Sequence, residues 1–190
     1  MLDHRGRLWL TSRVRPRENP AFCRDGSDHP SARQFPVTGS GRHLAMYDPE
    51  TEEYALISTC FSTHHLVFAE DDDHTLWTSG GGQVIGWLNT KMFDETGDEQ
   101  QAQGWTALVL DTNGNGKRDA YVEPDEAPDP SKDTRVRSGY YGVAVSPVDG
   151  TIWGSSLGFP GAILRLDPGP DPAATTTAAP PASSSPPPSK

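Results

Sequence analysis

The residues with the clearest chemical pattern form a loop of alternating oxygen-bearing groups between positions 111 and 119. Side-chain oxygens stand at relative positions 1, 3, 5 and 9, and position 7 offers a backbone carbonyl. In order, these residues are Asp111, Asn113, Asn115, Asp119 and, through its carbonyl, Lys117. Gly116 stands at position 6, where an EF-hand-type loop turns sharply and glycine permits the turn. Alternating hard oxygens suit Ca²⁺, so the sequence predicts a calcium site with a stabilising role.

Position 12 of this loop departs from the EF-hand pattern. Val122 stands where such loops carry a bidentate glutamate, and Glu123 comes one place later. The loop also follows a short apolar run at 108–110, which is typical of a strand and not of a helix. A solvated Asn-Gly turn between two strands therefore stays open as an alternative.

Two adjacent histidines, His64 and His65, form the second group that could do chemistry. Neighbouring residues of a strand point to opposite faces, so we expect the two imidazoles not to share one metal ion. We predict that His65 is the one able to act as an acid, a base or a ligand. The alternative is a polar pair at the start of a strand, and the acidic run at 70–73 is most simply a solvated turn.

A repeated pattern positions these residues. It consists of a short apolar strand, a turn rich in Asp or Gly, and then an apolar residue, a tryptophan and a small hydroxyl residue. The three copies lie at 2–12, 65–79 and 141–155, with their tryptophans at Trp9, Trp77 and Trp153. An acidic or Asp-Gly turn between β-favouring runs predicts a hairpin that buries its tryptophan on one face.

A second hairpin pattern accompanies each copy. It is complete at 43–57 and partial at 84–88, 105–110 and 162–168. Two hairpins give a four-stranded antiparallel unit, which is the blade of a β-propeller. We therefore predict an all-β fold in which residues 1–168 form a partial β-propeller of about two and a half blades. Long insertions at 13–40, 93–103 and 111–138 are read as loops, and insertions gathered on one face commonly mark the functional side.

The repeats resemble the virginiamycin B lyase (streptogramin lyase) family of propellers, of which this chain would be an incomplete fragment. The likeness rests on His-Leu-Val-Phe-Ala at 65–69, Leu-Trp-Thr-Ser at 76–79 and Tyr-Asp-Pro-Glu-Thr at 47–51. It implies metal-assisted ring opening of a cyclic depsipeptide by β-elimination, with Mg²⁺, histidines at blade starts and a glutamate. Here His65 falls on the blade-start position, and the third repeat carries Tyr141 instead.

Composition limits the class of partner. The formal net charge of −10 argues against nucleic acid, because binding phosphates requires a clustered basic surface. No apolar run approaches the ~20 residues of a membrane-spanning helix. We expect a small molecule or a protein, bound on the loop face, as the partner.

The two cysteines and the tail bear on the compartment. Cys23 and Cys60 could form one bridge in an exported protein or remain two free thiols. No signal peptide precedes the first repeat, so we expect either that the protein stays in the cytoplasm or that its N-terminus is missing here. The family likeness and a bridge together favour a periplasmic or secreted location. Residues 169–190 are rich in Pro, Ala, Thr and Ser and are predicted to be a disordered or polyproline-like tail.

Two functional hypotheses follow from the sequence. The first is a propeller domain of an exported protein that serves as a binding scaffold and is stabilised by calcium. The alternative is a lyase-like, metal-dependent enzyme that uses His65.

Overall fold

A computed structural model describes residues 1–80, 82–137, 139–156, 161–169, 172 and 177–178. Their regular secondary structure is mostly β-strand with little helix, which confirms the β-rich class predicted from the sequence. The strands are β1 (Leu8–Ser12), β2 (His43–Asp48), β3 (Glu53–Ile57), β4 (His65–Phe68), β5 (Thr75–Ser79), β6 (Val84–Asn89), β7 (Gln103–Ala107), β8 (Val109–Leu110), β9 (Tyr121–Val122), β10 (Asp133–Arg135), β11 (Gly142–Val145), β12 (Ile152–Ser155), β13 (Ile163–Asp167) and β14 (Thr177–Ala178). The helices are the 3₁₀ turn η1 (Ala21–Cys23), α1 (Pro30–Gln34), α2 (Thr90–Thr96) and α3 (Glu99–Ala102).

The strands of the described residues form four sheets, none of which closes on itself. Two are four-stranded antiparallel meanders, β4-β5-β6-β7 and β11-β12-β13-β14, and one is the three-stranded β1-β2-β3. The fourth, β8-β10-β9, is small and contains a parallel pair between β9 and β10. The hairpins predicted at 65–79, 141–155 and 43–57 are all present. In the first copy of the repeat, Leu2 forms a single bridge with Leu8 across the turn.

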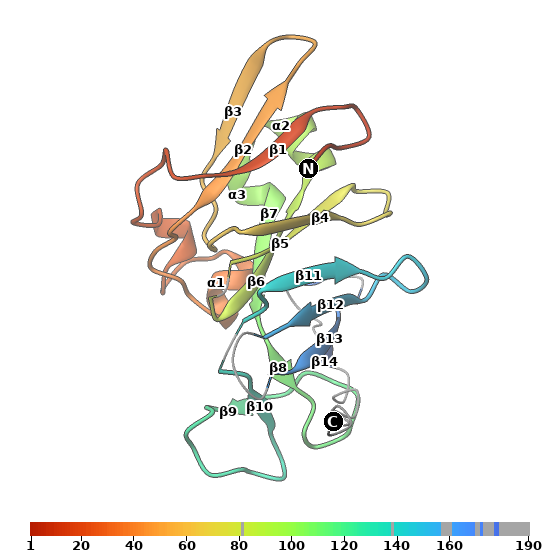
Figure 1. The fold of residues 1–190 in the computed structure, drawn as a ribbon. Coiled ribbons are helices and arrows are strands. Elements are labelled where there is room, and N and C mark those ends of the chain that lie inside the picture. The colour runs from red at the N-terminus through yellow and green to blue at the C-terminus, as the bar shows by residue number, and fades with distance from the viewer. Residues whose placement is uncertain (81, 138, 157–160, 170–171, 173–176, 179–190) are drawn as a thin grey trace.

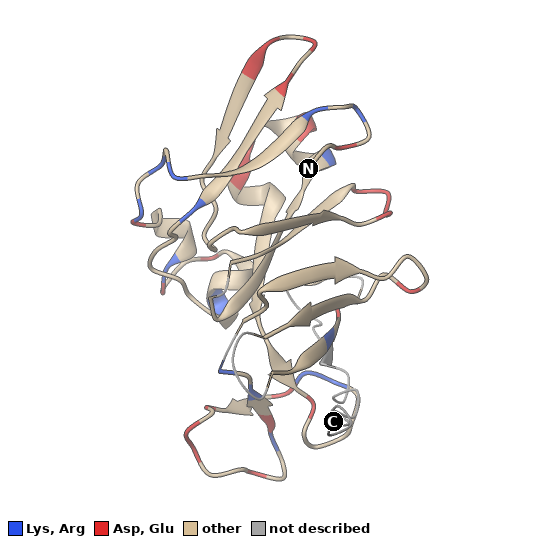
Figure 2. Cartoon of the chain, viewed as in Figure 1, with Lys and Arg blue, Asp and Glu red and all other residues tan. Residues whose placement is uncertain are grey.

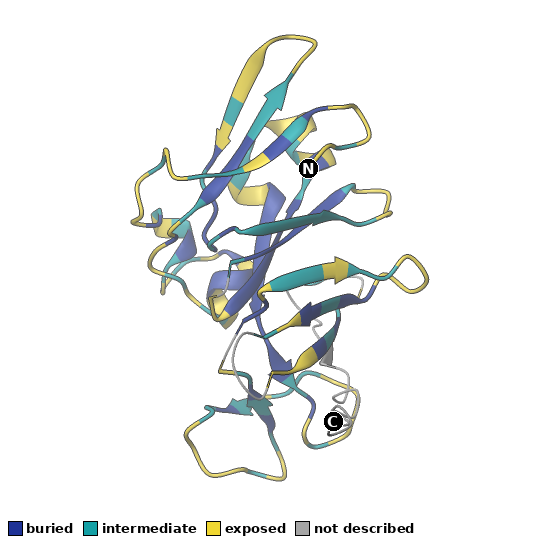
Figure 3. Ribbon diagram, in the orientation of Figure 1, coloured by how far each residue is buried: buried dark blue, intermediate teal, exposed yellow. Residues whose placement is uncertain are grey.

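Three of these sheets stack face to face in chain order (Figure 1). The middle sheet, β4–β7, lies between the other two. Because successive side chains of a strand point to opposite sides, one set packs against the first sheet and the other set against the third. On one face, Leu76 and Leu88 pack with Trp9 of the first sheet. On the other face, Trp77 and Ile85 belong to the cluster that also holds residues of the third sheet. Figure 3 shows β5, β6 and β7 of this middle sheet in dark blue and its edge strand β4 in teal.

The three repeated tryptophans differ in burial. Trp9 and Trp77 are buried, as the repeat predicts, whereas Trp153 is only partly buried. Ile152, the preceding residue, packs into the cluster shared with the middle sheet. By strand alternation, Trp153 then lies on the face turned away from that sheet.

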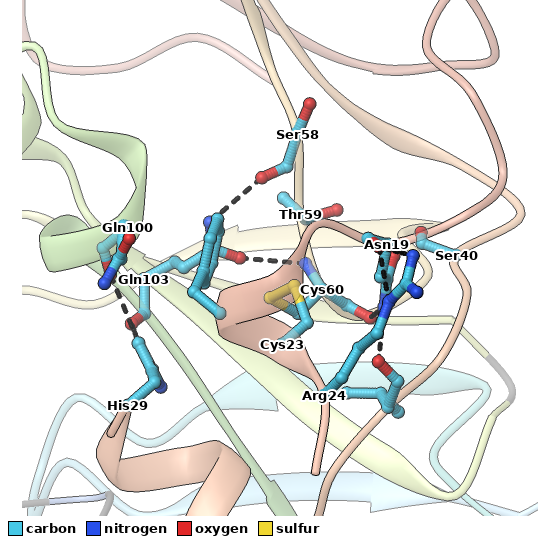
Figure 4. Close-up of a disulfide and its surroundings, with 12 residues drawn as sticks. Asn19, Cys23, Arg24, His29, Ser40, Ser58, Thr59, Cys60, Gln100 and Gln103 are labelled. Atoms are coloured by element: carbon cyan, nitrogen blue, oxygen red, sulfur yellow. Dashed lines mark hydrogen bonds between the residues drawn. A yellow bond between two sulfur atoms is a disulfide. The ribbon is translucent and has the colours of Figure 1, made fainter. Parts of the chain in front are cut away.

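The insertion at 13–40 is held to the sheets by a disulfide between Cys23 and Cys60 (Figure 4). Both cysteines are fully buried. The Cys60 carbonyl accepts a hydrogen bond from Asn19 Nδ2 at 2.7 Å, and its amide donates to Gln103 Oε1 at 2.9 Å. Of the two states that the sequence left open for these cysteines, the structure has the bridged one.

This insertion covers the open edge of β7. Ser31 Oγ, in α1, accepts a hydrogen bond from the Trp105 amide at 2.9 Å. The Trp105 indole donates to the Phe35 carbonyl at 2.7 Å, and the imidazole of His29 stacks on the indole at 4.7 Å between ring centroids. An edge strand with unpaired backbone groups is a template for aggregation, and here the insertion satisfies those groups instead.

The insertion at 93–103, read from the sequence as an acidic loop, is helical, so that reading was wrong. The side chain of Asn89 accepts from the Met92 amide and caps α2, which ends at Gly97 with φ of +66°. Asp98 then accepts from the amides of Gln100 and Gln101 and caps α3. The polar residues that suggested a loop are therefore the caps of two short helices.

The predicted tail at 169–190 lies mostly outside the described residues. Within it, β14 is described, and it pairs with β13 as the fourth strand of the last sheet. Across the described part of the chain, no helix is long and apolar enough to cross a membrane.

Candidate functional site

Strand directions bring two of the three long insertions and the two histidines to one end of the stacked sheets, whereas the insertion at 93–103 joins β6 to β7 at the other end. β4 begins at His65, which pairs with Ser79 at the end of β5, and β11 begins at the equivalent place in the third sheet. The insertions at 13–40 and 111–138 lead into β2 and β11 at this same end. Thr63 Oγ1 donates to the His43 carbonyl at 2.9 Å and so joins the start of β2 to the residue before His64. We name this end the loop face.

Three aromatic rings from two sheets converge at the loop face. The ring centroids of His64 and His65 are 4.4 Å apart. The ring of Tyr141 lies 5.2 Å from His64 and 4.9 Å from His65, measured between centroids. By strand register the counterpart of His65 is Gly142, because Gly142 pairs with Ser155 as His65 pairs with Ser79. Tyr141, the residue before β11, therefore corresponds to His64, the residue before β4. The sequence spacing, which aligned Tyr141 with His65, was wrong by one residue, because the turn of the third-sheet hairpin is one residue shorter.

The cluster of His64, His65 and Tyr141 keeps polar atoms without partners. His64 Nδ1 and His65 Nε2 are buried and make no hydrogen bond among the described residues. Desolvation, and then the neighbouring charges of His65 and Arg42, lower the pKa of His64. Ser79 Oγ donates to the Tyr141 carbonyl at 2.5 Å, which ties the two sheets together beneath the rings.

The expectation that the two imidazoles point to opposite faces was wrong. His64 precedes β4 and is not part of it, so strand alternation does not apply to the pair. Both rings instead gather around Tyr141.

The acidic run at 70–73 lies at the opposite end of the sheets from this cluster. β4 separates the two, and a strand rises about 3.3 Å per residue, so at least about 10 Å lies between them. Figure 2 shows the carboxylates gathered at the hairpin turns of this end. His65 and the acidic residues therefore do not form one site.

A cleft of about 460 Å³ opens between the second and third sheets at this turn end. Its lining includes Trp77 and Trp87 and carboxylates from both sheets, namely Glu70, Asp71, Asp73, Asp149 and Asp167. Hydrogen bonds from Ser146 and Thr151 hold the pKa of Asp149 well below its ordinary value. The sequence analysis interpreted the acidic turn as merely solvated, although its repeat pattern already places aspartates in the equivalent turns of both four-stranded sheets.

The oxygen-rich loop has the compact form that the sequence predicts. Asp111 is buried, and its Oδ1 accepts from the amides of Gly114 and Asn115 at 2.7 and 3.2 Å. Its Oδ2 accepts from Gly116 at 2.8 Å. Gly114 and Gly116 have φ of +77° and +74°, a backbone region in which side chains are strained.

Asp119 joins this loop through side-chain amides. Asn113 Nδ2 and Asn115 Nδ2 both donate to Asp119 Oδ2 and lower the pKa of that carboxyl. The Lys117 amide donates to Asn115 Oδ1 at 2.8 Å. The structure thus brings together the side chains of the four predicted oxygen residues, with Lys117 contributing its backbone only.

Neither residue near position 12 reaches this group. Val122 is buried in β9, and Glu123 accepts from Arg135 Nε at 2.8 Å. Within the described ranges, no three side chains of His, Cys, Asp or Glu are grouped so that they could hold a metal ion. A calcium site here would therefore depend on amide and carbonyl oxygens as well as carboxylates.

The buried histidines elsewhere are structural. His43 Nδ1 accepts from the Thr59 amide at 3.1 Å, and its Nε2 lies 3.0 Å from the Pro16 carbonyl. Burial lowers the pKa of His29 and His43, so both imidazoles are neutral at neutral pH and occupied by backbone partners.

Comparison with family models, curated proteins and solved structures finds no match to this chain. The likeness to streptogramin lyases stays a prediction from the repeats.

Proposed function

We propose that the chain is part of a β-propeller that serves as a binding scaffold, with its binding surface on the loop face. The sheets β1–β3, β4–β7 and β11–β14 would be consecutive blades. Three features support this: the sheets are antiparallel meanders, they stack in chain order, and the middle one is buried on both faces. A closed propeller buries each blade between two neighbours in the same way.

The observation that carries the binding function is the meeting of His64, His65 and Tyr141 at the loop face. Two ring nitrogens there have no hydrogen-bond partner among the described residues, and an unpartnered buried polar atom is costly unless something binds it. Flat rings beside free acceptors and donors suit a ligand with an aromatic group and a carboxylate or carboxamide. The insertions at 13–40 and 111–138 lead into strands at this face, as is common for binding loops.

Replacing His65 by alanine should weaken the binding of such ligands about three- to tenfold, the effect of one lost hydrogen bond. The probes are small aromatic carboxylic acids and carboxamides, and saturation-transfer-difference NMR measures their affinity. His4→Ala is the matched control, because His4 stacks on His74 in the turn region away from the cluster. No binding to the wild type, or equal weakening in both variants, would contradict the proposal.

The same proposal places the protein in the periplasm or outside the cell. The support is the buried Cys23–Cys60 bridge, since disulfides persist in oxidising compartments. Fractionation of the native host, followed by thiol labelling of the purified protein under denaturing conditions, tests this. A cytoplasmic protein with two reactive thiols would refute it.

A second candidate is the metal-dependent C–O lyase that the repeats imply. The observation that favours it is His65 Nε2, at the start of β4, which makes no hydrogen bond within the part of the chain that the structure describes. Chromatography of a streptogramin B, incubated with Mg²⁺ and the protein, separates the cyclic from the linear form. Linear product that disappears in His65→Ala would favour the lyase over a scaffold that only binds.

A further inference from the structure

The imidazoles at the loop face lack the backbone partners that occupy the buried histidines. His29 and His43 each meet backbone groups through both ring nitrogens. In the described part of the chain, His64 Nδ1 and His65 Nε2 have no hydrogen-bond partner. Tyr141, whose ring lies beside both, is 40% exposed. This cluster therefore offers polar groups to a ligand, whereas His29 and His43 do not.

Arg42 lies next to the cluster because of backbone hydrogen bonds. Its carbonyl accepts from the Thr63 amide at 3.2 Å and from Ser40 Oγ at 2.6 Å. Thr63 is the residue before His64, so the two segments lie side by side. Desolvation, and then the charges of His65 and Arg42, lower the pKa of His64. The guanidinium of Arg42 is thus close enough for its charge to act on the cluster.

The guanidinium of Arg42 has no acidic partner in the described ranges. Two other arginines of the neighbouring insertion do have one, since Arg24 binds Glu18 and Arg33 binds Asp28, each at 2.9 Å. The side chain of Arg42 is half-buried, so water screens its charge less than that of an exposed arginine. A cation of this kind, beside imidazole and phenol groups that can donate hydrogen bonds, favours an anion.

Charge is distributed unevenly between the two ends of the sheets. Residues 13–42 contain six arginines against three acidic residues, although the whole chain has a formal net charge of −10. Figure 2 shows basic segments at 13–17 and at the entry to β2, and acidic segments at the hairpin turns of the opposite end. An anion is therefore attracted to the loop face and repelled from the turn end.

We propose that the loop face selects an anionic ligand, an aromatic carboxylate, and that Arg42 supplies the charge that selects it. The planar guanidinium matches the two oxygens of a carboxylate, and the rings of His64, His65 and Tyr141 pack on the aromatic group. The inference rests on the proposed function, because it concerns the same surface. It narrows the ligand from a carboxylate or carboxamide to the carboxylate.

Phenylacetate and phenylacetamide test the inference, because they differ in charge and hardly in shape. In saturation-transfer-difference NMR, the wild-type chain should bind phenylacetate about fivefold more tightly, since a charge-assisted hydrogen bond is about twice as strong as a neutral one. Arg42→Gln should bind the two compounds equally, with its affinity for phenylacetamide unchanged. Arg42→Lys keeps the charge and should keep most of the preference for phenylacetate.

Arg33→Gln is the matched control. It removes the same charge from an exposed side chain that pairs with Asp28, so it should keep the wild-type preference. Equal affinity of the wild type for the two compounds, an unchanged preference in Arg42→Gln, or an equal loss of both compounds in that variant would overturn the inference and leave the binding function standing. If the wild type bound neither compound, the proposed function itself would fail, and the inference with it.

Discussion

Replacing Cys23 and Cys60 together by alanine will lower the free energy of unfolding by about 4 kcal/mol. The bridge joins residues separated by 37 positions, and a cross-link of this span removes that much conformational entropy from the unfolded chain. Both side chains are fully buried, so the variant also loses packing around the sulfur atoms. Urea unfolding followed by tryptophan fluorescence measures the difference.

In the double variant, local opening should increase first where the insertion covers β7. Once the bridge is absent, the contacts of Ser31 and Phe35 with Trp105 must hold the insertion by themselves. We therefore expect the Trp105 amide, an edge group of the sheet, to exchange with solvent faster than amides of the central strand β5.

Wild-type protein treated with a reducing agent is the control for the bridge itself. The reduced protein retains both sulfur atoms, and its free energy of unfolding should fall most of the way to that of the double variant. Equal stability of oxidised wild type and variant would mean that the bridge contributes nothing.

The hairpins were predictable because their signals are local. In the copy at 65–79, an apolar run, an acidic turn and Leu-Trp-Thr-Ser follow one another within a few residues, and the strands pair where this pattern places them. The same holds for the turn after Asp111, since the amides that donate to its carboxylate lie three to five positions later, at Gly114, Asn115 and Gly116.

The features that the sequence did not reveal depend on distant residues or on capping. Asp133 accepts from the amide of Asp119, in the oxygen-rich loop, only through the register of β10, which no local pattern encodes. α2 and α3 were missed because their caps, Asn89 and Asp98, are also common loop residues. The gathering of His64 and His65 with Tyr141 required knowing that two sheets stack with their first strands adjacent.

Replacing Arg7 by methionine should destabilise the protein by about 3–5 kcal/mol, the cost of leaving buried charges without their partner. Arg7 is 3% exposed, and its Nε donates to Asp3 at 2.7 Å. Its two terminal nitrogens bind Asp94 of α2 at 2.6 and 2.9 Å. The guanidinium thus joins the first turn of the chain to the helix of the middle sheet, and Asp3 in turn accepts from the Trp9 indole at 2.9 Å.

Arg5→Met is the matched control, because Arg5 also binds Asp94 but is largely exposed. An exposed ion pair contributes about 0–1 kcal/mol, so this variant should stay close to the wild type. If the two variants were equally stable, burial would not be the source of the effect at Arg7.

The difference in the free energy of unfolding between the wild type and Arg7→Met should become smaller at acid pH. Burial opposes the ionisation of Asp3, but hydrogen bonds from Trp9 and Arg7 outweigh it and hold the pKa of Asp3 below its ordinary value. A depressed carboxyl pKa stabilises the folded wild type above the unfolded pKa, about 3.9, and this stability is lost as pH falls below it. In the variant, Asp3 loses the hydrogen bond and charge of the Arg7 side chain, so its pKa rises and protonation costs the fold less. Urea unfolding midpoints of both proteins, at pH values above and below that pKa, measure this change. A difference between the two midpoints that does not vary with pH would show that Asp3 is not coupled to Arg7.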